Sequence, residues 1–295
     1  MSILAKGAYW IANTHIDRQF RKNGLERKLE ETDDYIIEYW DNGKSHLQPF
    51  IFIHGFGAKT KYQWYKQLSA VSDKYHLIVP NLLFFGETKA KHHWYSVQNQ
   101  VDFMRFFLDY KNVKDPLVMG ASYGALVAAE VERIVPGTWR RIFLVDAALK
   151  YVYEEDSLRV MKRFDIPSIP DLFAPSDTAS MQKHIKAAVG QYVPKFLLNE
   201  FHNEFFGEER QHKLRLANEM IRIRPDYEHH EYSIEAPVHL IWGENDYLIP
   251  PERGVLLQKH IGANATLDII KKAGHMPNMK RGNRFNRIML SYLKD

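Results

Sequence analysis

The residues with the clearest chemical potential lie at one turn in the middle of the chain. Gly120-Ala121-Ser122-Tyr123-Gly124 follows the apolar run Leu117–Met119 and precedes a stretch of small residues. A strand that turns sharply into a helix needs glycine on both sides of its central serine, and the turn points the hydroxyl into a cleft. The N-terminus of the following helix favours developing negative charge. The pattern therefore predicts that Ser122 is a nucleophile.

A serine hydroxyl is a weak nucleophile unless a base removes its proton and a carboxylate orients that base. Among the 14 histidines, His275 is the best candidate because it follows the last apolar run on a glycine-containing loop. Asp246 follows another apolar run and a glycine turn, and we prefer it as the acid to Glu244 and Asp146. The chain order Ser122, Asp246, His275 is typical of hydrolases whose serine lies on a strand-to-helix turn.

An acyl-transfer site also needs two backbone N–H groups that face the carbonyl oxygen of the substrate. Tyr123, directly after the serine, supplies one such amide. The second is the amide of Phe56, because His54-Gly55-Phe56-Gly57 ends an apolar run and its glycines let the backbone turn beneath a substrate. We therefore predict Phe56 and Tyr123 as the oxyanion-hole donors.

These residues need a scaffold, and the chain offers short apolar runs that alternate with helix-length stretches. The runs are Tyr35–Tyr39, Phe50–Ile53, His76–Val79, Leu117–Met119, Ile142–Val145, Val238–Trp242 and Thr266–Ile270. The helix-length stretches are Trp64–Val71, Val97–Tyr110, Tyr123–Val135, Arg253–His260 and Arg284–Leu293. Most runs are continuously apolar, as expected for strands covered on both faces. The alternation predicts an α/β fold with a mostly parallel central sheet flanked by helices.

The alternation stops between residues 150 and 234, where prolines and charges accompany helical patches. We expect this segment to form a helical lid inserted between sheet strands. The core is then built from residues 1–149 and 235–295, and residues 1–30 form an N-terminal helical extension. Leu4, Ala8 and Ile11 have helical spacing, which favours a terminal helix packed on its own domain. A helix that lies on a membrane surface is the alternative.

Four motifs, taken together and in this order, resemble those of a known family. They are His54-Gly55-Phe56-Gly57, Gly120-Ala121-Ser122-Tyr123-Gly124, Gly243-Glu244-Asn245-Asp246 and Gly274-His275. From Tyr35 to Leu293 the chain resembles the α/β-hydrolase-fold serine hydrolases, and among them the capped esterases and lipases similar to monoacylglycerol lipases. The resemblance implies a mostly parallel sheet, a helical lid between its sixth and seventh strands, and acyl-enzyme chemistry without a metal or organic cofactor.

Large apolar residues in the expected lid suggest the class of substrate. They are Phe164, Leu172, Phe173, Tyr192, Phe196, Leu197, Phe201, Phe205 and Phe206. Some must pack the lid itself, and the others could line an acyl-chain pocket together with Phe56. The residues that we expect to contact substrate are Gly55, Phe84, Phe85, Phe196 and Phe201. Similar capped relatives often act on lipid-like esters, so a monoacylglycerol or a related ester is the expected substrate.

Two rival functions remain open. A carbon–carbon bond hydrolase of the same fold would cleave vinylogous diketones, but such relatives often carry Asn beside the nucleophile and a longer Gly-Pro-Gly type loop. Neither occurs here. A non-catalytic ligand receptor on the same scaffold can lose part of its triad, whereas Ser122, Asp246 and His275 are all present. Ester hydrolysis is therefore the preferred interpretation.

Composition narrows the remaining possibilities. The 295 residues contain no cysteine, which excludes disulfides and thiolate metal sites and fits a reducing compartment. The 40 Lys and Arg against 36 Asp and Glu give a net charge of +4, too small an excess for a typical nucleic-acid binder. We expect a cytoplasmic protein, with peripheral membrane contact through the N-terminal helix as the alternative. The oligomeric state is left open.

The C-terminal stretch from Lys271 is the most basic part of the chain. It contains seven Lys or Arg residues and one acidic residue, Asp295. We expect a solvated helix face there, and contact with anionic lipid or an acidic partner is the alternative.

Overall fold

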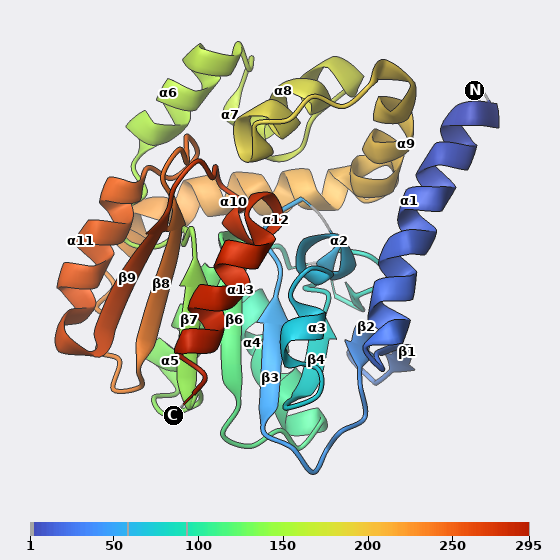
Figure 1. Cartoon of the computed structure of the whole chain (residues 1–295). Coiled ribbons are helices and arrows are strands. Elements are labelled where there is room, and N and C mark those ends of the chain that lie inside the picture. The colour runs from blue at the N-terminus through green and yellow to red at the C-terminus, as the bar shows by residue number, and fades with distance from the viewer. Residues whose placement is uncertain (1–2, 58, 93, 295) are drawn as a thin grey trace.

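One twisted sheet runs through the middle of the molecule, with helices on both faces (Figure 1). The computed structural model describes residues 3–57, 59–92 and 94–294. Within them the strands are β1 (Glu26–Glu31), β2 (Tyr35–Asp41), β3 (Pro49–Ile53), β4 (His76–Pro80), β5 (Lys89–Ala90), β6 (Leu117–Ala121), β7 (Arg141–Val145), β8 (Val238–Gly243) and β9 (Ala265–Ile270). Their order is β1-β2-β4-β3-β6-β7-β8-β9, and β5 pairs with β2.

The sheet is parallel from β4 to β9 and antiparallel where β2 meets β1, β4 and β5. This confirms the predicted α/β fold with a mostly parallel sheet. Side chains of β3 alternate between two cores, because Phe50 and Phe52 face one and Ile51 and Ile53 the other. Burial on both faces explains why the strand sequences are continuously apolar.

The helices outside the segment 150–234 cover the two sides of this sheet. They are α1 (Ile3–Lys22), α2 (Thr60–Trp64), α3 (Leu68–Val71), α4 (Val97–Tyr110), α5 (Tyr123–Ile134), α11 (Pro251–Ile261), the 3-10 turn η1 (Gly262–Asn264), α12 (Pro277–Lys280) and α13 (Gly282–Ser291). Residues of α4, α5 and α11 share a core with Ile51, whereas α2, α3 and α13 pack with Phe50. The expected helix Trp64–Val71 is instead two short helices joined by a turn.

Between β7 and β8 the chain forms only helices. They are α6 (Glu154–Phe164), α7 (Ile169–Phe173), α8 (Thr178–Val189), α9 (Lys195–Phe206) and α10 (Arg210–Glu228). We call this segment, residues 150–234, the helical insertion. It lies across the carboxyl ends of the parallel strands (Figure 1). Ligands of open α/β sheets bind at that edge, so the insertion covers the region where a site is expected.

The N-terminal extension departs from the expected helix over residues 1–30, because α1 ends at Lys22 and Glu26–Glu31 form β1. This strand is paired along its length with β2 and lies at the sheet edge. Its sequence Glu-Arg-Lys-Leu-Glu-Glu is highly charged and Leu29 is largely exposed, so it lacks the apolar pattern that marks the other strands. Charged residues on an edge strand also oppose pairing with another chain.

α1 packs against α9 of the helical insertion and against α2. The Tyr9 ring meets the edge of the Phe201 ring at a centroid distance of 5.8 Å, and the Tyr9 and Tyr62 hydroxyls are 2.9 Å apart. Trp10 and Ile11, on another side of the helix, are largely exposed. The side chains of Leu4 and Ala8 lie outside the described part of the structure. Among the described residues, no helix combines the length and apolar character needed to cross a membrane.

The turn between β6 and α5 leaves no space for a methyl group, which gives a stability prediction. A Cβ added to Gly124 would lie 2.5 Å from the backbone oxygens of His54 and Ile53. Gly124→Ala should therefore lower the free energy of unfolding by about 1–3 kcal/mol, as overpacking does. Gly282→Ala is the matched control, because its nearest neighbour is the flexible Lys66 side chain. Urea unfolding of both variants measures the effect, and equal losses would contradict the packing argument.

Candidate active site

Ser122 occupies a strained turn between β6 and α5. Its backbone angles are φ 51° and ψ −113°, a conformation that residues with a Cβ rarely adopt and that costs about 1–3 kcal/mol. Backbone hydrogen bonds hold the turn against β7 and the loop that follows it, from Ser122 N to Val145 O at 2.8 Å and from Ala148 N to Ser122 O at 3.2 Å. Ser122 follows the last residue of β6, and its side chain lines a cavity.

His275 joins Ser122 to Asp246. Its Nε2 lies 2.9 Å from Ser122 Oγ, and its Nδ1 lies 2.7 Å from Asp246 Oδ2. A neutral imidazole has one N–H and one lone pair. Because a carboxylate only accepts, Nδ1–H donates to Asp246 and Nε2 is left to accept from the Ser122 hydroxyl. The structure thus brings together the three predicted residues, in contact and in the required order.

The Asp246 carboxylate is held by backbone N–H groups of the loop that follows it. Its Oδ1 accepts hydrogen bonds from Leu248 N at 2.9 Å and from Ile249 N at 3.0 Å, so its free direction is toward His275. The loops after β8 and β9 touch, because a Cβ on Gly243 would lie 2.1 Å from Gly274 O. Glycine at Gly243 therefore permits the approach that places Asp246 against His275.

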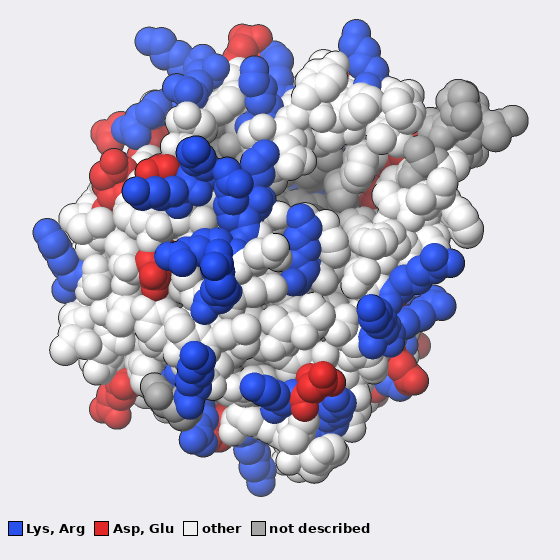
Figure 2. Space-filling view, in the orientation of Figure 1, with Lys and Arg blue, Asp and Glu red and all other residues white. Residues whose placement is uncertain are grey.

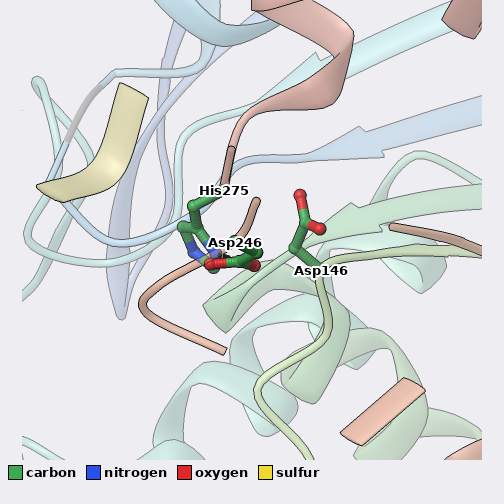
Figure 3. A group of neighbouring side chains, drawn as sticks. All are labelled: Asp146, Asp246 and His275. Atoms are coloured by element: carbon green, nitrogen blue, oxygen red, sulfur yellow. Dashed lines mark hydrogen bonds and ion pairs between the residues drawn. The ribbon is translucent and has the colours of Figure 1, made fainter. Parts of the chain in front are cut away.

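Asp146, the second candidate acid, lies beside this pair at the end of β7 (Figure 3). It is fully buried, and its Oδ1 accepts from Gly243 N at 2.8 Å. Its Oδ2 has no hydrogen-bond partner in the described part of the chain. Burial, and then the nearby charge of Asp246, raise the pKa of Asp146 well above its usual range. A raised pKa favours the protonated form of Asp146, and a neutral carboxyl is a poor partner for a protonated imidazole.

One oxygen or nitrogen from each of Asp146, Asp246 and His275 lies within 4.8 Å of the others, which is also the spacing of a metal site. The hydrogen bonds argue against that role. His275 Nδ1 carries the hydrogen that it donates to Asp246, and the lone pair on Nε2 accepts from Ser122, so the ring has no lone pair left for an ion. Asp246 and His275 are better explained as two members of the hydrogen-bonded chain that ends at Ser122, with Asp146 as a buried neighbour.

The loop after β3 is braced from two sides. His54 donates from Nδ1 to Gly55 O at 2.8 Å and accepts at Nε2 from Leu82 N at 3.0 Å. Burial lowers the pKa of His54 to about 4, so the ring stays neutral and keeps both bonds at neutral pH. Gln63 Oε1 accepts from Gly55 N at 2.7 Å. Together His54 and Gln63 fix the backbone on both sides of Gly55.

The predicted oxyanion donors are the amides of Phe56, in the loop after β3, and of Tyr123, the first residue of α5. Their rings meet at a centroid distance of 5.6 Å, and a Cβ on Gly55 would lie 3.3 Å from Ser122 Cβ. Neither amide donates to another group among the described residues. Two N–H donors beside a serine are what a developing oxyanion requires.

Ser122 opens into a cavity of about 450 Å³ beneath the helical insertion. Most of its lining is apolar, and it includes Ile16, Phe56, Leu126, Ile169, Leu172, Phe173, Met181, Phe201, Phe205, Phe206, Met220 and Met279. Such a volume and lining fit a small ligand with a substantial apolar part. Another cavity, of about 690 Å³, lies between α1 and the β1–β2 edge and is lined mainly by charged groups such as Arg27 and Glu38.

The predicted substrate contacts divide into two groups. Gly55 and Phe201 line the cavity. The described lining does not include Phe84, Phe85 or Phe196. Phe84 packs against the Tyr95 ring at a tilt, Phe85 is fully buried behind Phe56, and Phe196 is largely exposed. The expectation for these three residues therefore differs from the structure, because tertiary packing, not apolar character, decides which aromatic rings face the cavity.

Basic side chains gather on the surface near α12 and α13, beside a hollow (Figure 2). Lys280, Arg281 and Arg284 are exposed there. Met276 and Met279, next to Lys280 in the chain, line the cavity. The basic surface therefore lies next to one wall of the cavity.

Comparison with known proteins assigns the chain to a family. A family model described as the alpha/beta hydrolase fold matches residues 48–281. The chain belongs to the α/β-hydrolase fold family. This confirms the resemblance drawn from the four motifs, and it supports hydrolysis as the general activity.

Relatives that match most of this hydrolase carry names of different activities. It is 24% identical over 280 residues to the dihydrolipoyllysine-residue acetyltransferase component of the acetoin cleaving system of Cupriavidus necator, spanning 90% of the hydrolase and 68% of that protein. It is 25% identical over 270 residues to lipase 1 of Psychrobacter immobilis, spanning 88% and 82%. The solved structure of Lip1 from Acinetobacter baumannii AYE superposes with a TM-score of 0.83 at 22% identity, covering 95% of each chain.

A shorter match is to a hydrolase with a different kind of substrate in its name. Over 70 residues the hydrolase is 36% identical to a 2-hydroxy-6-oxononadienedioate/2-hydroxy-6-oxononatrienedioate hydrolase of Burkholderia vietnamiensis, which is 24% of each chain. The match is local, because it leaves about three quarters of each chain outside the comparison.

Two residues of the site were missed from the sequence. Gln63, which holds the Gly55 amide, lies in a short helix with no motif to mark it. His184 lines the cavity from α8, inside the helical insertion. Spacing along the chain could not reveal either residue, because each reaches the site only through tertiary packing.

The neutral state of Asp146 predicts how stability depends on pH. In the unfolded chain Asp146 ionises above about pH 4, whereas the folded protein keeps its proton there. The folded state then binds more protons, so wild-type stability falls as pH rises through this window, by at most about 1.4 kcal/mol per pH unit. Asp146→Asn removes that loss, and its free energy of unfolding relative to wild type should rise from pH 4 to pH 7.

Urea unfolding at pH 4, 5, 6 and 7 tests this expectation, with the exposed Asp73→Asn as a control for the type of substitution. A difference between Asp146→Asn and wild type that stays constant with pH would show that Asp146 is ionised in the folded protein.

Proposed function

We propose that this protein is a serine hydrolase that cleaves carboxylic esters with an apolar acyl chain. The observation that carries the proposal is the chain of contacts from Asp246 through His275 to Ser122, at the wall of a mostly apolar cavity. The two free amides beside Ser122 add the donors that acyl transfer requires.

In the proposed reaction, Ser122 Oγ attacks the ester carbonyl while His275 Nε2 takes its proton. The amides of Phe56 and Tyr123 donate to the oxyanion. The tetrahedral species collapses when His275 returns the proton to the leaving alcohol, and the acyl group stays on Ser122. Water then attacks the acyl-enzyme by the same steps, and the acid leaves. Asp246 holds the reactive imidazole tautomer and stabilises its charged form.

The apolar character of the cavity supports an acyl chain as the main contact. Leu172, Phe205 and Phe206 from the helical insertion face the same space as Ser122. We propose that the insertion acts as a lid that shields the acyl chain and the reacting bond from water. Each buried methylene then contributes about 0.8 kcal/mol of binding. A monoacylglycerol, or a similar lipid-like ester, fits this arrangement.

Carbon–carbon bond cleavage is the second candidate, favoured by the 70-residue match to a dienedioate hydrolase. The same serine and histidine could act on a vinylogous diketone. The residue before Ser122 is Ala121 and the loop after β3 reads His-Gly-Phe-Gly, so the features that such relatives often carry are missing. A vinylogous diketone in the substrate panel separates the two reactions.

Replacement of the nucleophile is the first test of the proposal. Ser122→Ala should lower kcat for p-nitrophenyl ester hydrolysis by about 10⁴–10⁶, because no other group can form the acyl-enzyme. A fluorophosphonate probe should label the wild type and not this variant. Ser291→Ala, in α13, is the matched control and should keep both signals. Retention of more than a tenth of wild-type kcat in Ser122→Ala would exclude Ser122 as the nucleophile.

Chain-length preference tests the acyl pocket. For p-nitrophenyl acetate, butyrate, octanoate and decanoate below their micelle concentrations, kcat/KM should rise with chain length until the cavity is filled. A fully buried methylene would give about a fourfold gain, if its binding energy is realised in the transition state. Ser122→Ala supplies the background rate. A series that is flat or falls after acetate would refute the apolar pocket and favour a small polar substrate.

A further inference from the structure

One polar group of the cavity has no part in the proposed mechanism. His184, on α8, lines the cavity, and its Nδ1 lies 2.6 Å from the backbone oxygen of Leu172. A carbonyl oxygen can only accept, so Nδ1 carries the hydrogen. The lone pair is then on Nε2, for which the described residues offer no partner. His184 therefore holds a free acceptor at the cavity wall.

The environment keeps this acceptor neutral. Burial lowers the pKa of His184, and the nearby charge of His275 lowers it further when that ring is protonated. The ring edge packs against Phe206 at a centroid distance of 6.0 Å, and the Leu172 carbonyl fixes its orientation. A neutral imidazole held in this way accepts hydrogen bonds and does not donate from Nε2.

His184 lies beside the loops that surround the reacting bond. A Cβ added to Gly57, next to the proposed donor Phe56, would lie 3.9 Å from His184 Nε2. One turn further along α8, Ala188 O would lie 3.4 Å from a Cβ on Gly274, the residue before His275. α8 thus spans from the oxyanion loop to the loop of the proposed base, and His184 lies near the first of these.

We propose that His184 Nε2 accepts a hydrogen bond from a free hydroxyl in the alcohol part of the ester. The inference rests on the proposed function and specifies its substrate class: monoesters of a 1,2-diol or of glycerol. The leaving oxygen must face His275 Nε2, because that nitrogen returns the proton. A hydroxyl on the neighbouring carbon then lies within a few ångströms of the reacting bond, in the same region as His184.

The surrounding cavity makes this contact selective. Phe56, Phe173 and Phe206 supply apolar surface around His184, and a hydroxyl buried among them without a partner would lose its hydrogen bonds to water. With His184 as acceptor, that loss is offset. An ester whose alcohol ends in a methyl group leaves the His184 acceptor unpaired, which is unfavourable in its turn.

Two esters of equal size test the assignment. 2-Hydroxyethyl octanoate and propyl octanoate differ by a hydroxyl in place of a methyl group. Wild type should favour the hydroxyethyl ester in kcat/KM by about 2–10-fold, the value of one net hydrogen bond. In His184→Phe the ratio should fall to about one. His184→Gln, whose amide oxygen can accept, should recover part of the preference.

His202→Phe is the matched control. His202 lies in α9 of the same helical insertion, and its Nε2 contacts Pro175 O at 3.1 Å away from the described cavity lining. This variant should keep the wild-type ratio. Because both esters report on the same enzyme sample, the ratio does not depend on how much of a variant is folded.

The outcomes are distinct. A wild-type ratio near one, or a preference that survives in His184→Phe, would overturn the role of His184 while ester hydrolysis stands. A loss of the ratio in His202→Phe as well would assign the preference to the packing of the insertion and also overturn it. No hydrolysis of either ester or of p-nitrophenyl octanoate would overturn the proposed function itself.

Discussion

The site depends on the contact between the β6–α5 turn and the end of β3. Gly124 touches the backbone oxygens of Ile53 and His54 so closely that no Cβ can be accommodated. This contact supports the strained backbone of Ser122, and it also places the loop that carries Phe56 opposite Tyr123. Strain of about 1–3 kcal/mol persists only where the surroundings fix the backbone. The same packing therefore fixes both the turn that carries Ser122 and the loop that carries Phe56.

The neighbouring carboxyl groups of Asp146 and Asp246 show how similar residues acquire different charges. Asp246 receives two backbone N–H bonds on one oxygen and His275 on the other. Asp146 receives one, from Gly243, and lies in a fully buried position. Two like charges this close oppose one another, so the less solvated group keeps its proton. Burial of Asp146, and then the charge of Asp246, therefore raise the pKa of Asp146 and leave Asp246 as the aspartate that can stabilise a charged imidazole.

Local signals were sufficient for seven of the nine strands among the described residues and for the three residues in contact. Apolar runs mark strands buried on both faces, and glycine-bounded turns at strand ends placed Ser122, Asp246 and His275 at one edge. β1 was missed because an exposed, charged edge strand has no apolar alternation. Phe84, Phe85 and Phe196 resemble pocket residues by type alone, and only packing directs their rings elsewhere. Residues that act through long-range packing, such as Gln63 and His184, leave no local pattern.

The sheet edge and the helical insertion contribute to the site in different ways. The sheet edge supplies the reacting groups through turns whose geometry the backbone dictates, whereas α7 to α9 supply side chains such as Leu172, His184 and Phe205. Apolar contacts of this kind are tolerant of exact shape, and they select for chain length rather than for a particular group. Polar contacts in the same space are few, and each one discriminates more strongly, because a buried donor or acceptor left unpaired is costly. Specificity for the alcohol of an ester can therefore rest on one side chain of the insertion while the sheet and its turns stay the same.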